Sequence, residues 1–151
     1  MSQNGAMSEA PPLPRDQRKI DADHLNLLSI FHFVGAGLAL LAMLFLLGHY
    51  AMFHAIMDNP KMWENQKGTP PPKEFFDVLK WFYLIAGAWL LGSGVLNVIS
   101  GFSLRARKRR MFSMIVAGLN CVHIPLGTVL GVFTLVVLMR DSVRESYDAL
   151  E

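Results

Sequence analysis

Residues 25–57 read LNLLSIFHFVGAGLALLAMLFLLGHYAMFHAIM and contain no Asp, Glu, Lys or Arg. A charge at the centre of a bilayer costs roughly 2.5–3.5 kcal/mol even on the mildest scale, so a long uncharged run is typical of a membrane helix. As an α-helix these 33 residues extend about 50 Å, whereas a hydrocarbon core is about 30 Å thick. The run therefore predicts a first span over residues 25–48, with an amphipathic extension that ends at Asp58, Asn59 and Pro60.

The rest of the chain segregates charge in the same way. Charged residues make up only 17% of the 151 residues and hydrophobic residues 52%, whereas a soluble domain carries about 25% charged residues. The formal net charge of +2 is too small to indicate nucleic-acid binding. We expect one membrane domain over residues 21–148, preceded by a disordered cytoplasmic tail over residues 1–20.

A second apolar segment follows a polar, proline-rich loop. It begins with Trp81, Phe82 and Tyr83, which form the kind of aromatic belt found at a water–lipid boundary. The next basic residue is Arg105. These limits predict a second span over residues 81–104.

The last uncharged run, residues 111–139, has Pro125 and Gly127 near its middle. Proline removes a helix hydrogen bond and clashes with the preceding turn. We therefore expect two helices, residues 107–123 and 126–143, joined by a tight turn at Ile124 and Pro125. The alternative is one kinked helix, which would place the C-terminus on the opposite side of the membrane.

These segments together predict an all-α polytopic membrane protein, with four transmembrane helices in an up-down bundle. The first two helices are expected to extend beyond the outer face. Helices in lipid pack through small residues, and such residues recur four apart at Gly35 and Ala39, Ala88 and Gly92, Ala117 and Cys121, and Gly127 and Gly131. We interpret them as internal packing faces, with a homo-oligomer face and the general abundance of glycine in membrane helices as alternatives.

Basic residues set the expected orientation. With four helices, ten Lys and Arg residues fall on one side and four on the other, which predicts both termini in the cytoplasm by the positive-inside rule. The densest group comprises Arg105, Arg107, Lys108, Arg109 and Arg110. This group is expected to fix the topology, to bind anionic lipid head groups, or to do both.

Few residues suggest chemistry. The chain has no Gly-rich phosphate loop, no Cys-x-x-Cys and no paired carboxylates within a span, so we expect no catalysis, no resident metal and no cofactor. His49 and His123 lie near the predicted outer surface and are the candidates for a haem site. Interfacial hydrogen bonding is the alternative. Asn97 and Asn120 lie within spans and need partners, either on a neighbouring helix or in a polar cavity that His123 would share.

The final third of the chain has a recognisable order: a basic loop, an apolar helix, the motif Pro125-Leu126-Gly127-Thr128 with Gly131, and an apolar helix that ends at Arg140. This order resembles small uncharacterised four-span bacterial inner-membrane proteins. The resemblance implies a hairpin at Pro125, Gly127 and Thr128 between the last two helices, and it implies no activity.

Three functional hypotheses follow. The first is a non-catalytic scaffold, accessory subunit or regulator, whose partners are membrane lipids and a membrane protein or a second copy of the chain. The second is a haem- or metal-binding redox component that uses the outer histidines. The third is a small passive channel or carrier lined by Asn97, Asn120 and Thr128.

The predicted orientation has a direct test. Green fluorescent protein fused after Glu151 should fluoresce, and alkaline phosphatase fused there should be inactive, because both predicted termini are cytoplasmic. Phosphatase inserted between Asp58 and Lys80 is the matched control and should be active. Phosphatase activity at Glu151 would contradict the orientation.

Overall fold

The computed structural model describes residues 14–59, 61 and 72–149, and this part of the chain is helical without strands. The helices are α1 (Pro14–Met57), α3 (Lys73–Ala106), α4 (Arg110–Asn120), α5 (Leu126–Leu138) and α6 (Asp141–Asp148). The all-α prediction is therefore confirmed. Residues 14–20, expected in the tail, are helical instead, because proline suits a first helical turn and Gln17 hydrogen-bonds Asp21 one turn later. Residues 1–13 lie outside the described part.

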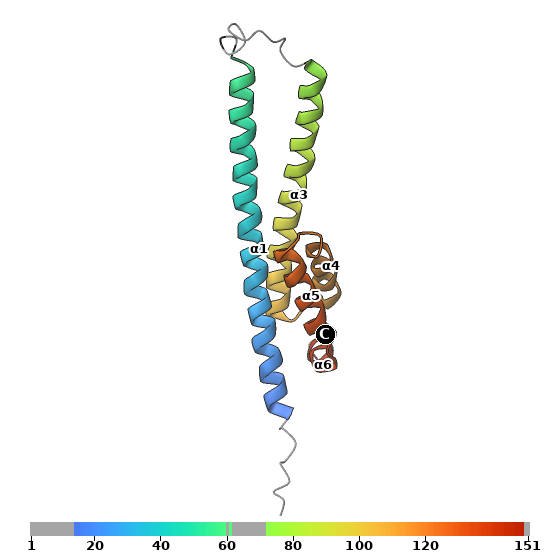
Figure 1. Cartoon of the computed structure of the whole chain (residues 1–151). Helices are drawn as coiled ribbons and strands as arrows, with labels where there is room; N and C mark the ends of the chain where they lie inside the picture. Colours follow the sequence, from blue (N-terminus) through green and yellow to red (C-terminus); the bar gives the residue numbers. More distant parts are fainter. Residues whose placement is uncertain (1–13, 60, 62–71, 150–151) are drawn as a thin grey trace, which may run out of the picture.

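Two helices, α1 and α3, dominate the molecule and run antiparallel along each other (Figure 1). Their 44 and 34 residues extend about 66 and 51 Å. Contacts pair Phe33 with Phe102, Ala39 with Gly94, and Tyr50 with Tyr83. Both helices are long and apolar enough to cross a membrane, and many of their large apolar side chains are exposed.

The segments expected to form the third and fourth spans are shorter than predicted. Helices α4 and α5 have 11 and 13 residues, about 17 and 20 Å, against the predicted ranges 107–123 and 126–143. Arg107 and Arg109 adopt left-handed backbone angles that delay the start of α4. Arg140 is extended and separates α5 from α6, and the two helices are bent by 71°. The structure thus does not confirm a four-span bundle: α5 and α6 would make a third candidate span only as one bent unit.

Helices α4 and α5 form an antiparallel hairpin rather than one kinked helix (Figure 1). The turn is closed by Thr128 Oγ1, which donates to the Cys121 carbonyl at 2.8 Å, and by the Gly127 N–H, which donates to the His123 carbonyl at 2.7 Å. A Cβ added at Gly131 would overlap the Ala117 carbonyl oxygen, and one at Gly127 would overlap the Asn120 carbonyl oxygen. Glycine is therefore required where the hairpin backbones meet.

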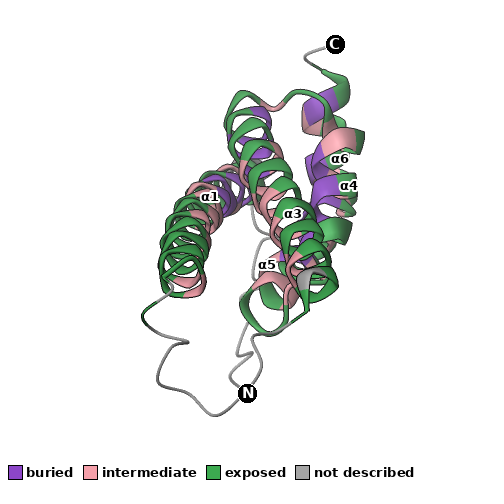
Figure 2. Cartoon of the chain, turned by 90° about the horizontal axis from the view of Figure 1, so that it is seen from above, coloured by how far each residue is buried: buried purple, intermediate pink, exposed green. Residues whose placement is uncertain are grey.

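Buried residues gather where the short helices meet α1 and α3, and much of both long helices is exposed (Figure 2). The apolar cluster at this end includes Leu25, Leu104, Leu138, Val143 and Tyr147. Helix α6 turns its apolar side into this cluster. Burial raises the pKa of Tyr147 to about 12, although nearby Arg107 and Arg110 oppose the shift, so its phenol is neutral at physiological pH.

The hairpin contact predicts opposite effects for substitutions at Gly131, within the contact, and at Gly118, outside it. Gly131→Ala should lower the free energy of unfolding in detergent by roughly 1–3 kcal/mol, because the new methyl group meets backbone that has nowhere to move. Gly118→Ala is the matched control, because an added Cβ there meets nothing within 4 Å, and it should raise stability by up to about 1 kcal/mol through helix propensity. Equal effects of the two substitutions would contradict the close contact.

Candidate functional site

Asn97 lies at the centre of a buried polar network between the helices. Its side-chain nitrogen donates to Asn120 Oδ1 at 3.0 Å, and Asn120 Nδ2 donates back to Asn97 Oδ1 at 2.8 Å. The same Asn97 nitrogen also donates to the Ser93 carbonyl at 2.9 Å. The reciprocal amide pair therefore joins α3 to α4 within the apolar part of the bundle.

His32 extends this network to α1 and α5. Its Nδ1 lies 2.8 Å from Asn97 Oδ1, and its Nε2 lies 3.4 Å from Thr134 Oγ1. Because the Asn97 nitrogen is committed to Ser93 and Asn120, its oxygen faces the imidazole, which assigns the proton to Nδ1. Thr134 donates to the Leu130 carbonyl at 2.8 Å. Both His32 and Thr134 are fully buried, so one side chain from each of four helices meets here.

A cavity of about 110 Å³ adjoins the network between α3 and α4. Its polar lining comprises Ser93, Asn97, Asn120 and His123. Trp89 forms the outer wall: its ring stacks on His123 at 5.6 Å, and its Nε1 donates to His123 Nε2 at 3.0 Å. The cavity has room for a few waters or a very small polar molecule. Asn120 and His123 thus bond a neighbouring helix and also line a cavity, which combines the two alternatives expected for them.

The two histidines considered for haem are not brought together. His49 hydrogen-bonds the Tyr83 hydroxyl, whereas His123 bonds Trp89. Tyr83 and Trp89 are six positions apart on α3, about 9 Å along its axis and on different faces. Each ring already has a protein partner, so this geometry does not favour a shared haem. Among the described residues, no three His, Cys, Asp or Glu side chains converge on a metal position.

Other candidate residues have separate locations. Gly35 packs beside Asn97, and Ala39 packs against Gly94. Ala88 and Gly92 line the cavity rather than a tight helix contact. Thr128 lies in the hairpin turn and is absent from the cavity lining.

The residues of the basic cluster at the end of α3 differ in their contacts. Arg110 Nε donates to the Leu138 carbonyl at 2.8 Å and so ties the two ends of the hairpin together. Arg107 and Arg109 have φ angles of 51° and 54°, a conformation that costs roughly 1–2 kcal/mol for residues other than glycine. Arg105 and Lys108 are exposed.

A second ionic group ties α6 to α1. Arg140 Nη1 lies 3.4 Å from the buried Asp21 carboxylate and donates to His24 Nδ1 at 3.2 Å. Gln17 Nε2 donates to the same Asp21 oxygen at 3.2 Å. Arg140 therefore fixes the bend between α5 and α6 against the start of α1.

Sequence reasoning missed His32, Thr134 and Trp89 as parts of the site. His32 carried a signal, because Ser29, His32 and Gly35 recur every third residue on one face of an otherwise apolar helix. No family model, curated protein or solved structure matches this chain.

The network predicts a specific non-additivity. Asn97→Leu should lower the free energy of unfolding by roughly 1–3 kcal/mol, because it leaves both Asn120 and His32 without their amide partner. Asn120→Leu should cost less, because Asn97 keeps Ser93 and His32. The double variant should be no less stable than Asn97→Leu alone, since within the described part of the chain the Asn120 side chain bonds only Asn97. Additive losses, measured by unfolding in micelles, would contradict the reciprocal pair.

Proposed function

We propose that this chain is a non-catalytic inner-membrane protein, a scaffold, accessory subunit or regulator that binds a second membrane protein. In this proposal α1 and α3 cross the bilayer and both termini are cytoplasmic. The hairpin of α4 and α5 enters from the cytoplasmic side and returns to it. Support comes from the ten basic residues that this arrangement assigns to the cytoplasmic side and the four that it assigns to the other.

The hairpin of α4 and α5 ends partway along α3. From Arg105 to Trp81, α3 rises about 36 Å, which matches a hydrocarbon core plus its boundaries. The hairpin tip is bonded at Trp89, about 12 Å short of Trp81. At that tip Ile124 is 83% exposed, and Val122 and Leu126 are also exposed. Lipid is the medium that suits such a tip. Local thinning of the bilayer would make α4 and α5 full spans without moving either terminus.

The proposal depends on an exposed apolar surface of α3 above the hairpin tip, which we call the apolar step. Val78, Phe82 and Ile85 lie on the same line of α3 as Trp89, at helical spacings of 11, 7 and 4 residues. All three are exposed, Phe82 by 62%. Phe82 and Ile85 lie on the membrane side of Trp81, and Val78 lies about one helical turn beyond it. Together with the tip they form an exposed apolar surface of a size suited to a helix from a partner. Aromatic side chains such as Phe82 and Trp89 are enriched at protein–protein interfaces.

Photo-crosslinking tests the step. Benzoylphenylalanine in place of Phe82, in cells that make the protein at its natural level, should give one discrete adduct with a second membrane protein. Phe45, 75% exposed on α1, is the control position and should give no such adduct. The partner proposal would be overturned by equal adducts at the two positions or by no protein adduct at all. Adducts with this chain alone would also overturn it and would indicate a homo-oligomer.

A passive channel or carrier is the second candidate, and the cavity beside Asn97 and Asn120 favours it. In liposomes, flux of water or a small neutral solute should then fall when Asn120 is replaced by leucine. Flux equal to that of protein-free liposomes, or unchanged by Asn120→Leu, would exclude it.

A further inference from the structure

The face of α1 and α3 opposite the hairpin carries an apolar groove of about 470 Å³. All of its lining residues come from these two helices, among them Phe33, Gly37 and Met43 on α1 and Leu91, Gly94 and Val98 on α3. At its floor the helices face each other at ordinary packing distance, because a Cβ on Gly94 would lie in van der Waals contact, 3.5 Å from the Ala39 methyl group. At Gly37 an added Cβ would meet nothing within 4 Å, so the groove is open above it.

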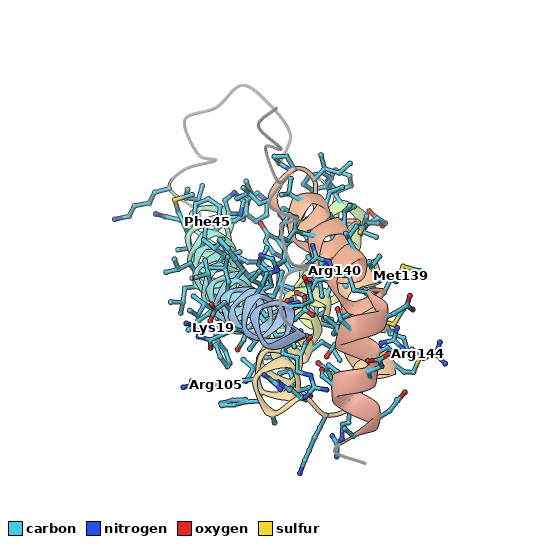
Figure 3. All side chains as sticks on the ribbon, turned by 90° about the horizontal axis from the view of Figure 1, so that it is seen from below. Lys19, Phe45, Arg105, Met139, Arg140 and Arg144 are labelled. Carbon is cyan, nitrogen blue, oxygen red and sulfur yellow. The ribbon has the colours of Figure 1, made fainter. Side chains whose placement is uncertain are left out.

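Two basic side chains stand at the cytoplasmic end of the same face. Lys19 precedes Gly37 by 18 residues, which is five full helical turns, and Arg105 follows Gly94 by 11 residues, close to three turns. Each therefore continues the line of its helix that borders the groove. Figure 3 shows Lys19 and Arg105 on one side of the molecule, apart from Arg140 and Arg144. Both are exposed, and neither forms an ion pair with any described residue.

We propose that this groove binds an anionic phospholipid of the cytoplasmic leaflet, with one acyl chain in the groove and the phosphate between Lys19 and Arg105. The groove extends over the eleven residues from Phe33 to Met43 on α1, a rise of about 15 Å, which is one leaflet of a hydrocarbon core of about 30 Å. Phe102 lies between Arg105 and the groove along α3, and its ring meets the Phe33 ring edge-on with a centroid distance of 5.0 Å. An acyl chain that enters the groove from Arg105 would pass this aromatic pair.

Charge favours lipid over a second copy of the chain in this groove. A two-fold dimer about the membrane normal brings the same patch of both copies together, so Lys19 and Arg105 would face their own duplicates. The phosphate of an anionic head group is instead attracted by both charges. The site lies on the opposite face from the apolar step, so it does not depend on the proposed protein partner.

Native mass spectrometry of the full chain in detergent tests the site, with phosphatidylglycerol as the probe and phosphatidylcholine and inorganic phosphate as separate arms. Phosphatidylglycerol should bind at one site, and neither of the other two should. Replacing Lys19 and Arg105 together by glutamine should weaken binding about 25-fold, which is about fivefold per charge. Arg144→Gln, an exposed charge on α6, should leave binding unchanged.

A second pair of variants separates the groove from the charges. Gly37→Leu should fill the groove and reduce phosphatidylglycerol binding at least tenfold. Gly48→Leu is the matched control, because a Cβ there also meets nothing within 4 Å and Gly48 lies outside the groove. Equal binding by the two leucine variants, equal binding of both lipids, or binding of phosphate alone would overturn the proposal. So would a dimer that only Gly37→Leu abolishes, because a second copy would then be the occupant.

Discussion

The reciprocal amide pair of Asn97 and Asn120 is the interaction on which the rest of the bundle depends. Apolar contacts between helices gain little in lipid, because acyl chains are as apolar as leucine. A polar side chain within the apolar layer must instead find a partner on another helix or remain unpaired at considerable cost. Asn97 hydrogen-bonds both Asn120 and His32, so all three buried side chains gain a partner from another helix. Its position therefore sets how α1, α3 and the hairpin are aligned.

That alignment explains the asymmetry of the molecule. The hairpin is held at the level of Asn97 by the amides and at its tip by Trp89, and the Gly131 contact keeps α4 and α5 close. Eleven and thirteen residues are enough to reach these partners but not to cover the upper parts of α1 and α3. Beyond the hairpin tip, α1 and α3 therefore mainly contact each other among the described residues. Tyr50 packs against Tyr83 there, and Phe53 packs against Phe76.

Some of this architecture was predictable from the sequence because charge and proline leave local signals. The uncharged run at residues 25–57 and the aromatic start at Trp81 mark the two long helices, and Pro125 marks the break between α4 and α5. The lengths of α4 and α5 were not predictable, because residues 111–139 carry no charge that would mark a helix end. The network was hidden for another reason: His32 meets partners 65 and 102 positions away, and helical periodicity says nothing about such pairs.

The positive-inside count gives every Lys and Arg the same weight, whereas in the structure some of these side chains make internal contacts and others do not. Arg110 and Arg140 are engaged within the molecule, one on a helix carbonyl and the other on Asp21 and His24, so much of their donor capacity stabilises the hairpin and α6. Lys19 and Arg105 form no such contact with any described residue and lie on the face that carries the apolar groove. Removing either kind of charge changes the positive-inside count by the same amount. Only removal of the first kind also breaks a described internal contact, so a loss of stability would distinguish Arg110 and Arg140 from Lys19 and Arg105.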